Sequence, residues 1–224
     1  MSIKENLEQI KASLPKNVTL VAVSKTKPES DIMIAYGAGQ RVFGENKIQE
    51  MTSKWENLPK DIKWHMIGHV QRNKVKYMAP FVSLIHGVDS LKLLKEINKQ
   101  AQKHDRIINC LLQVHIAKED TKFGMDEGEV ISLLGSDEFK NMQNIKIMGL
   151  MGMATFTEDE TRIKDEFTFL HGLFEKLKGI YPASAKINID TLSMGMSGDY
   201  NIAIACGSNM VRIGSNIFGA RNYN

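Results

Sequence analysis

One lysine follows an apolar segment, at a place where a buried amine could do covalent chemistry. Residues 19–23 read T-L-V-A-V and are followed by S-K, so Lys25 lies two residues after Val23. In an extended chain Val21, Val23 and Lys25 point to the same side, because successive side chains alternate. If that side faces the interior, loss of water favours the neutral amine that forms a Schiff base with an aldehyde. The alternative is an ordinary solvated lysine at a strand end.

The last part of the chain combines a cationic side chain with turns rich in glycine and serine. Arg212 lies inside the short apolar run 210–213, so one orientation buries its guanidinium, which then needs partners, and the other exposes it. Small residues, hydroxyls and backbone N–H groups in the neighbouring turns suit a phosphate. The alternative is that these turns only join strands to helices. The turn residues concerned are Ser193, Gly195, Gly214 and Ser215.

Other polar residues next to apolar segments have simpler explanations. Asn46 follows F-G-E and either faces a ligand or begins the next helix as its N-cap. His65 and His69 are four residues apart, but the segment is a strand that runs into a glycine, so the two rings need not share a face and the spacing does not predict a metal site. His86 and Asp89 are expected at a rim or at a helix start.

These residues are carried by strand-like segments that alternate with helical ones. Helices are indicated by the S-x-x-E capping box of Ser2 and Glu5, by Ser90 as an N-cap, and by an apolar stripe that begins after Thr161. Alternation implies parallel pairing, and eight units predict a single closed (β/α)8 TIM barrel over residues 1–224. A doubly wound open sheet is the competing architecture. The strands are expected at residues 19–23, 41–43, 62–67, 82–88, 109–116, 145–153, 187–191 and 210–213.

The composition argues against several other classes of protein. The chain has 224 residues, of which 42% are hydrophobic and 25% charged, with a net charge of +3. This is typical of a globular protein and too mild to predict a nucleic-acid partner, so the basic segment 72–76 is expected to be a solvated helix face. No apolar run resembles a signal peptide or a membrane span, and we expect a soluble, cytoplasmic protein. Cys110 and Cys206 lack metal-binding spacing and are expected to be reduced thiols.

In a (β/α)8 barrel the chemistry lies at the carboxyl ends of the strands, so the lysine, the arginine and the turns would meet at one face. Pyridoxal 5′-phosphate (PLP) has the matching groups: an aldehyde for Lys25, a ring nitrogen for Arg212, and a phosphate for Gly214 and Ser215. We therefore expect PLP as the ligand. A barrel that binds another phosphorylated metabolite without covalent chemistry remains an alternative.

A series of motifs supports this expectation. V-A-V-S-K-T-K-P, F-G-E-N-K-I-Q-E, W-H-M-I-G-H-V-Q-R-N-K, H-G-V-D-S, T-K-F-G-M, L-S-M-G-M-S-G-D and G-S-N-M-V-R-I-G-S-N-I-F-G-A-R follow one another in order. With them the chain closely resembles the pyridoxal phosphate homeostasis protein family over nearly its full length. The resemblance implies the barrel of the alanine racemase N-terminal domain and an internal aldimine at Lys25. It also implies a position near the cofactor for Asn46, contact with its phosphate for Ser193, Met194, Gly214 and Ser215, and an Arg212 that faces the pyridine nitrogen.

Four positions depart from the pattern of the family. Lys47 replaces a more usual tyrosine, His115 a common asparagine, and Gly152 and Met153 a more usual small or proline-bearing stretch. We expect these residues on the rim, where they would affect partner surfaces rather than the bond to the cofactor.

The same residues favour a cofactor-binding homeostasis protein over an enzyme. An arginine leaves the pyridine nitrogen unprotonated, which weakens the ring as an electron sink. A racemase needs two opposed bases, and beside Lys25 no tyrosine is an obvious second one. We expect a monomer, because the β domain of the racemases is missing, with PLP-dependent apoenzymes as possible partners. A single-domain amino-acid racemase is the alternative. The tyrosines considered are Tyr36, Tyr77, Tyr181, Tyr200 and Tyr223.

Overall fold

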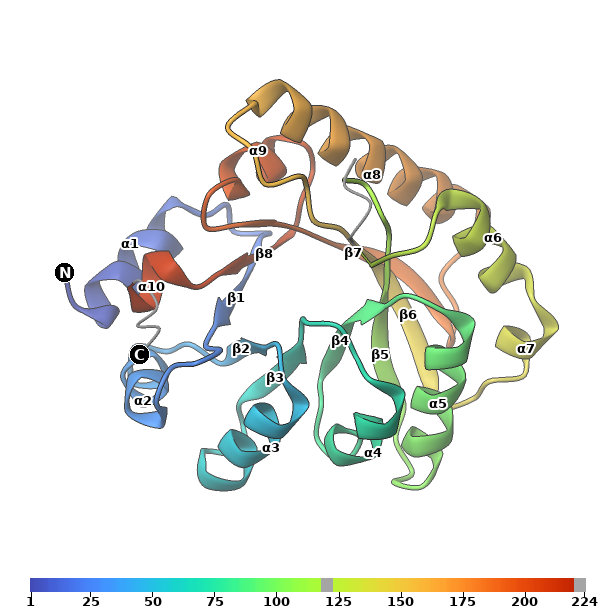
Figure 1. The fold of residues 1–224 in the computed structure, drawn as a ribbon, viewed down its shortest axis with the longest axis horizontal. Helices are drawn as coiled ribbons and strands as arrows, with labels where there is room; N and C mark the ends of the chain where they lie inside the picture. The colour runs from blue at the N-terminus through green and yellow to red at the C-terminus, as the bar shows by residue number, and fades with distance from the viewer. Residues whose placement is uncertain (118–122, 220–224) are drawn as a thin grey trace.

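The computed structural model describes residues 1–117 and 123–219 as a closed barrel of eight parallel strands, surrounded by helices (Figure 1). Each strand pairs with the next, and the barrel closes where β1 meets β8. The predicted barrel is confirmed, and the open sheet is excluded. The strands are β1 Thr19–Val23, β2 Val42–Glu45, β3 Lys63–Met66, β4 Leu84–Val88, β5 Ile108–Gln113, β6 Ile145–Met151, β7 Ile187–Met196 and β8 Met210–Ile213.

The helices lie on the outside of the barrel, mostly one after each strand (Figure 1). In the described ranges they are α1 Ile3–Ser13, α2 Glu29–Gly37, α3 Ile48–Asn57, the short η1 Arg72–Lys74, α4 Val75–Met78, α5 Leu91–Gln102, α6 Glu127–Gly135, α7 Asp137–Lys140, α8 Glu160–Ile180, α9 Tyr200–Ala205 and α10 Ser215–Phe218.

The first strand shows how alternation sorts side chains between two cores. Leu20 and Ala22 pack with the large cluster between the strands and the helices. Val21 faces the other way and belongs to a small cluster inside the barrel. Both faces of such a strand are buried, which is why it reads as a continuous apolar run. The buried partners of Val21 are Leu84, Leu111, Met151 and Met210.

The predicted helix starts are confirmed by their caps. The Ser2 hydroxyl accepts from the Glu5 N–H at 3.3 Å, and the Glu5 carboxylate accepts from the Ser2 N–H at 2.8 Å. The Ser90 hydroxyl accepts from the Leu93 N–H at 3.3 Å. Helix α8 begins at Glu160, one residue before the expected Thr161, because the carboxylate of the preceding aspartate caps it.

Five strands end at a residue other than the expected one: β2 ends at Glu45 instead of Phe43 and β3 at Met66 instead of Ile67, and the larger differences lie further along the chain. β5 ends at Gln113 and β6 at Met151, both earlier than predicted, whereas β7 continues five residues beyond Thr191, to Met196. The serine and glycine of L-S-M-G-M suggested a loop, but this segment still pairs with β8, with an irregular register. Both cysteines are free thiols, as expected, and burial raises the pKa of the Cys110 thiol.

Within the described ranges, no helix has the length and apolar character that crossing a membrane requires. The same ranges contain no cluster of three or more histidine, cysteine, aspartate or glutamate side chains placed to hold a metal ion.

Candidate cofactor site

A cavity of about 540 Å³ opens at the carboxyl ends of the strands. This volume lies in the range of small-molecule sites, about 300–1,000 Å³. Residues from both ends of the sequence meet there, because closing the barrel places β1 beside β8. Five of the predicted site residues line the cavity: Lys25, Asn46, Arg212, Gly214 and Ser215.

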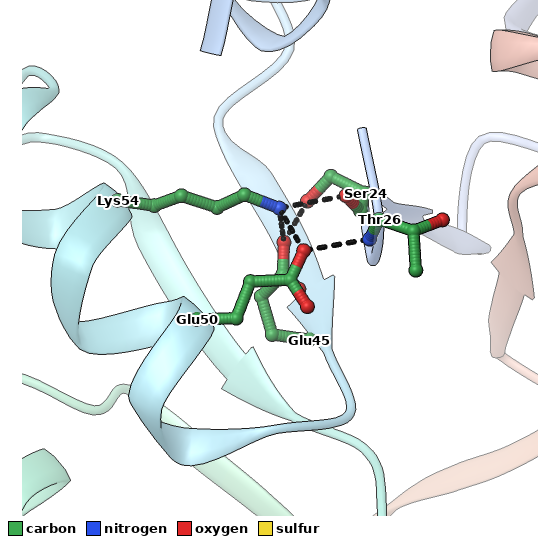
Figure 2. Close-up of polar contacts among 5 residues, drawn as sticks. All are labelled: Ser24, Thr26, Glu45, Glu50 and Lys54. Carbon is green, nitrogen blue, oxygen red and sulfur yellow. Dashed lines mark hydrogen bonds and ion pairs between the residues drawn. The ribbon is translucent and has the colours of Figure 1, made fainter. Parts of the chain in front are cut away.

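Lys25 is half-buried and lies in the turn between β1 and α2, as the alternation of side chains predicts. Its two neighbours in the chain are held by a polar cluster from β2 and α3 (Figure 2). The backbone of Thr26 has a φ of 64°, which is uncommon for a residue that is not glycine. The loop that carries Lys25 is therefore held in one specific conformation.

Lys54 lies at the centre of that cluster, which also contains Ser24, Thr26, Glu45 and Glu50 (Figure 2). Its ammonium donates to the Ser24 carbonyl at 2.8 Å and to Oε1 of Glu45 and of Glu50, each at 2.7 Å. The Ser24 hydroxyl donates to Glu45 Oε1 at 2.6 Å, and the Thr26 N–H donates to Glu50 Oε1 at 2.6 Å. One lysine of α3 thus links both residues that flank Lys25 to the second strand and the third helix.

Glu45 is a buried acid in this cluster. Burial raises the pKa of its carboxyl, and the nearby Lys54 ammonium acts in the opposite direction. Its second oxygen, Oε2, is buried without a hydrogen-bond partner among the described residues. The ion pair of Lys54 and Glu45 is almost completely excluded from solvent, with 7% of the Lys54 side chain exposed and none of the Glu45 side chain.

Asn46 is a cavity residue rather than a helix cap. The N-cap of α3 is Lys47, and Asn46 precedes it at the end of β2, half-buried against the cavity. A neighbouring glycine allows this placement, since a Cβ on Gly68 would lie 2.5 Å from the Asn46 carbonyl oxygen. The W-H-M-I-G-H motif therefore contributes the glycine that lets the two backbones approach.

Arg212 points into the barrel and is only 3% exposed, so the exposed alternative is wrong. Its Nη1 donates to the Ser193 carbonyl at 2.9 Å and to the Ser193 hydroxyl at 2.7 Å, and its Nη2 donates to the Gly152 carbonyl at 3.0 Å. Burial lowers the pKa of the guanidinium to about 10, with Asp199 acting in the opposite direction. At neutral pH it is therefore a charged donor at the wall of the cavity.

Ser193 and Met194 do not line the cavity, which corrects the expected phosphate contacts of their side chains. Both are fully buried in β7: Ser193 contacts Arg212 inside the barrel, and Met194 belongs to the outer core. Because β7 is longer than predicted, the turn that reaches the cavity begins later, at Ser197 and Gly198. Gly195 is still required, since its φ is 96° and a Cβ would lie 2.6 Å from Ala203 Cβ.

The turns that follow β7 and β8 nevertheless have the character expected of a phosphate site. The Ser197 hydroxyl accepts from the Gly214 N–H at 3.2 Å, and the Ser197 carbonyl accepts from Asn216 Nδ2 at 3.1 Å. A Cβ on Gly214 would lie 3.1 Å from the Val23 carbonyl oxygen, so a glycine allows β8 to lie close to β1. Small residues and a hydroxyl therefore border the cavity where Gly214 and Ser215 were predicted.

The sequence interpretation missed several lining residues, notably Asp199 and the segment Met153 to Thr157. Gly152 and Met153 were expected on the rim, but Gly152 is buried and supplies a carbonyl to Arg212, while Met153 lines the cavity. Polar residues directly after β6, in G-M-A-T-F-T, were the available signal. Lys47 is exposed and His115 half-buried, as rim positions allow.

One histidine lies elsewhere than expected. His86 is fully buried inside the barrel instead of at its rim. His69 is near the mouth, where its ring stacks on Phe123 with centroids 4.1 Å apart and its Nδ1 lies 3.3 Å from Asp89. Neither histidine lines the cavity, and the same holds for the described tyrosines. Tyr223 lies outside the described residues.

The chain matches the family model of the alanine racemase N-terminal domain over residues 1–222. It is 40% identical to the pyridoxal phosphate homeostasis protein of Pasteurella multocida, over 100% of this chain and 99% of that one. It is 38% identical to the Escherichia coli protein of the same name, over 93% and 88% of the two chains. The chain belongs to the pyridoxal phosphate homeostasis protein family.

Solved structures agree with this assignment. PipY of Synechococcus elongatus, with PLP bound, superposes with a TM-score of 0.87 at 33% identity, over 97% of this chain and 100% of that one. Alanine racemase from E. faecalis shares only the fold, with a TM-score of 0.74 at 14% identity. That superposition covers 98% of this chain but only 58% of the racemase.

Proposed function

We propose that this protein binds PLP in the cavity and serves PLP homeostasis, as a single domain that holds the cofactor covalently through Lys25. One observation carries the proposal: an amine on a fixed loop, a buried guanidinium and a turn of small residues border one cavity of about 540 Å³. The names of the relatives and the PLP bound to PipY support it.

The residues fit the three parts of PLP. Lys25 offers the amine for its aldehyde, and Gly214, Ser215 and Ser197 offer hydroxyl and backbone groups for its phosphate. Arg212 offers a charged donor for the ring nitrogen, and Asn46 lies on the same wall. When bound, PLP supplies an aldehyde that reacts reversibly with amines and a ring that accepts electron density.

The protein side of this site favours holding the cofactor over turning over substrates. With a pKa of about 10, Arg212 keeps its proton at neutral pH, so it gives the ring nitrogen a hydrogen bond and no proton. An unprotonated ring stabilises carbanions poorly. Among the described lining residues, only Lys25 and Asp199 could act as bases, and Asp199 already accepts from the Met196 N–H at 2.5 Å. A racemase needs two free bases on opposite faces.

Borohydride reduction with mass mapping tests the covalent bond. We expect a yellow protein that loses its visible band on reduction, with the pyridoxyl mass on the peptide that contains Lys25. Lys25→Ala should lose the label, while Lys27→Ala should keep it, because Lys27 binds the Phe218 carbonyl at 2.9 Å and does not line the cavity. An unlabelled wild-type protein, or Lys25→Arg that binds PLP as tightly as wild type, would favour a barrel for a non-covalent phosphorylated ligand.

The racemase alternative has its own measurement. Exchange of the α-proton of L-alanine in deuterated water should stay near the rate of free PLP. Steady racemisation at an ordinary enzymatic rate that disappears in Lys25→Ala would replace the homeostasis role with an enzymatic one. In that case, loss of racemisation in Asp199→Asn would identify Asp199 as the second base.

A further inference from the structure

A chain of buried polar side chains crosses the inside of the barrel. His65 Nδ1 on β3 lies 3.0 Å from His86 Nε2 on β4, and His86 Nδ1 lies 3.0 Å from the Ser193 hydroxyl on β7. That hydroxyl accepts from Arg212 at 2.7 Å. β4 and β7 are not neighbours in the sheet, so the contact between His86 and Ser193 bridges the interior. The four residues of this chain are between 0% and 6% exposed.

The two ends of this chain reach opposite faces of the barrel. Arg212 lines the cavity proposed for PLP. His65 lines a second hollow of about 470 Å³, whose other residues include Thr19, Lys63 and Asn109, near the beginnings of their strands. The hydrogen-bonded chain therefore extends through the barrel from its amino-terminal to its carboxyl-terminal end.

The chemistry of the groups favours one direction for every bond. A guanidinium can only donate, so the Ser193 oxygen accepts from Arg212. Among the described residues, the other partner of that hydroxyl is His86 Nδ1, so the hydroxyl proton is satisfied only when His86 Nδ1 accepts it. His86 accordingly carries its proton on Nε2 and donates to Nδ1 of His65, whose own proton lies on Nε2.

Both histidines must be neutral for this arrangement, and their surroundings favour that state. Burial lowers the pKa of His65 to about 3, and Lys63 acts in the same direction. Burial also lowers the pKa of His86, and the positive charge of Arg212, like that of His65 whenever His65 is protonated, acts in the same direction. The charged groups that act on the pair are therefore all cations.

We propose that Ser193 and His86 are positioning residues that hold Arg212 as a fixed donor toward the cofactor's ring nitrogen, with His65 locking the tautomer of His86. This inference rests on the proposed binding of PLP and explains why a serine inside β7 matters although it does not line the cavity. A purely space-filling role for these polar side chains is the competing explanation.

The first test reads the chain without any cofactor. In the cofactor-free protein, ¹⁵N-detected NMR of the imidazoles should show both buried histidines neutral at pH 7 with the proton on Nε2. Ser193→Ala should change the Nδ1 resonance of His86, because that nitrogen loses its donor. A proton on Nδ1 of His86, or a charged ring, would overturn the proposed direction of the bonds whether or not PLP binds.

The second test compares two substitutions of one residue. His86→Asn keeps an acceptor within reach of Ser193, whereas His86→Leu keeps none. We expect His86→Leu to weaken PLP affinity about tenfold or more, as expected for a lost hydrogen bond in a network that holds a charge, and to shift the visible absorption of the bound cofactor. His86→Asn should stay within about threefold of wild type in affinity and keep the wild-type absorption.

Cys110→Ala is the matched control, since Cys110 is fully buried on the adjacent strand β5 but belongs to the outer core. It should change thermal stability without changing the absorption maximum. Equal losses in His86→Asn and His86→Leu, or an unchanged spectrum in a folded His86→Leu protein, would show that the chain only fills space. Failure of the wild-type protein to bind PLP would instead reject the proposed function, and the NMR result would stand separately.

Discussion

The two sides of the cavity hold their cations in opposite ways. Beside β1, the Lys54 ammonium lies 2.7 Å from each of two carboxylates, those of Glu45 and Glu50. Beside β8, the guanidinium of Arg212 is held by neutral oxygens of Ser193 and Gly152. In the described part of the chain no carboxylate lies within 4 Å of it, and Asp199 acts only from farther away.

This difference suits the two cations to different tasks: one holds the loop that carries Lys25, and the other faces a ligand in the cavity. A cation that is neutralised by carboxylates has little charge left for a ligand, and Lys54 accordingly holds the backbone on both sides of Lys25 (Figure 2). A cation that is held by neutral acceptors keeps its charge, and Arg212 presents that charge to the cavity. Each cation thus has a different role, although both are buried at the same end of the barrel.

Replacement of Lys54 should have the largest effect on the free energy of unfolding. Lys54→Met leaves the fully buried Glu45 carboxylate without its cation, which costs about 3–5 kcal/mol for a buried pair. Arg212→Met leaves only neutral acceptors and should cost about 1–3 kcal/mol. Urea unfolding measures both, with the 64% exposed Lys4 changed to Met as a control within about 0.5 kcal/mol. Equal losses at Lys54 and Arg212 would contradict the comparison.

The stability of the protein should also depend on pH through the buried, neutral histidine His65. In the unfolded chain a histidine has a pKa near 6.5, and in the folded protein that of His65 is about 3, so the unfolded state binds more protons between these values. The free energy of unfolding should therefore fall as the pH drops below 6.5, by up to about 1.4 kcal/mol per pH unit for each such histidine.

Urea unfolding between pH 5 and 7 gives this slope, and His65→Gln should reduce it. The comparison with the variant isolates the histidine from carboxylates that titrate lower. A His65→Gln protein with the wild-type slope would show that the ring of His65 is not buried in its neutral form.

The smallest effect is expected at Glu45. Burial raises the pKa of its carboxyl above 4.5, so between 4.5 and the folded-state pKa the folded protein binds more protons, and ionisation lowers stability as the pH rises. Glu45→Gln removes this penalty while its amide oxygen still accepts from Lys54 and Ser24. Its stability at pH 7 should lie within about 1 kcal/mol of wild type and should gain on wild type from pH 4 to 7.

A loss of more than about 3 kcal/mol in Glu45→Gln would mean that Lys54 needs both negative charges. The loop of Lys25 would then be held by a true ion-pair network. In the expected case, Lys54 needs only oxygen acceptors, whether charged or neutral.

Local patterns predicted the parts of the fold that depend on neighbouring residues. The alternation in T-L-V-A-V-S-K places Lys25 on the interior side, and the capping signals at Ser2 and Ser90 mark real helix starts. The end of β7 could not be predicted in this way. Ser193 reads as a loop residue, and it is accommodated in a buried strand only because His86 and Arg212, distant in sequence, satisfy its hydroxyl.

The sequence by itself determined the eight alternating units, and hence the barrel and the end of it at which Lys25, Asn46, Gly214 and Ser215 meet. It did so because alternation and capping are properties of short segments. Only the tertiary structure decided which polar residues face the cavity, which ones support them, and that Lys54 has carboxylate partners while Arg212 has none within 4 Å among the described residues. Those choices depend on contacts across the closed barrel, where burial makes each polar group find a partner far along the chain.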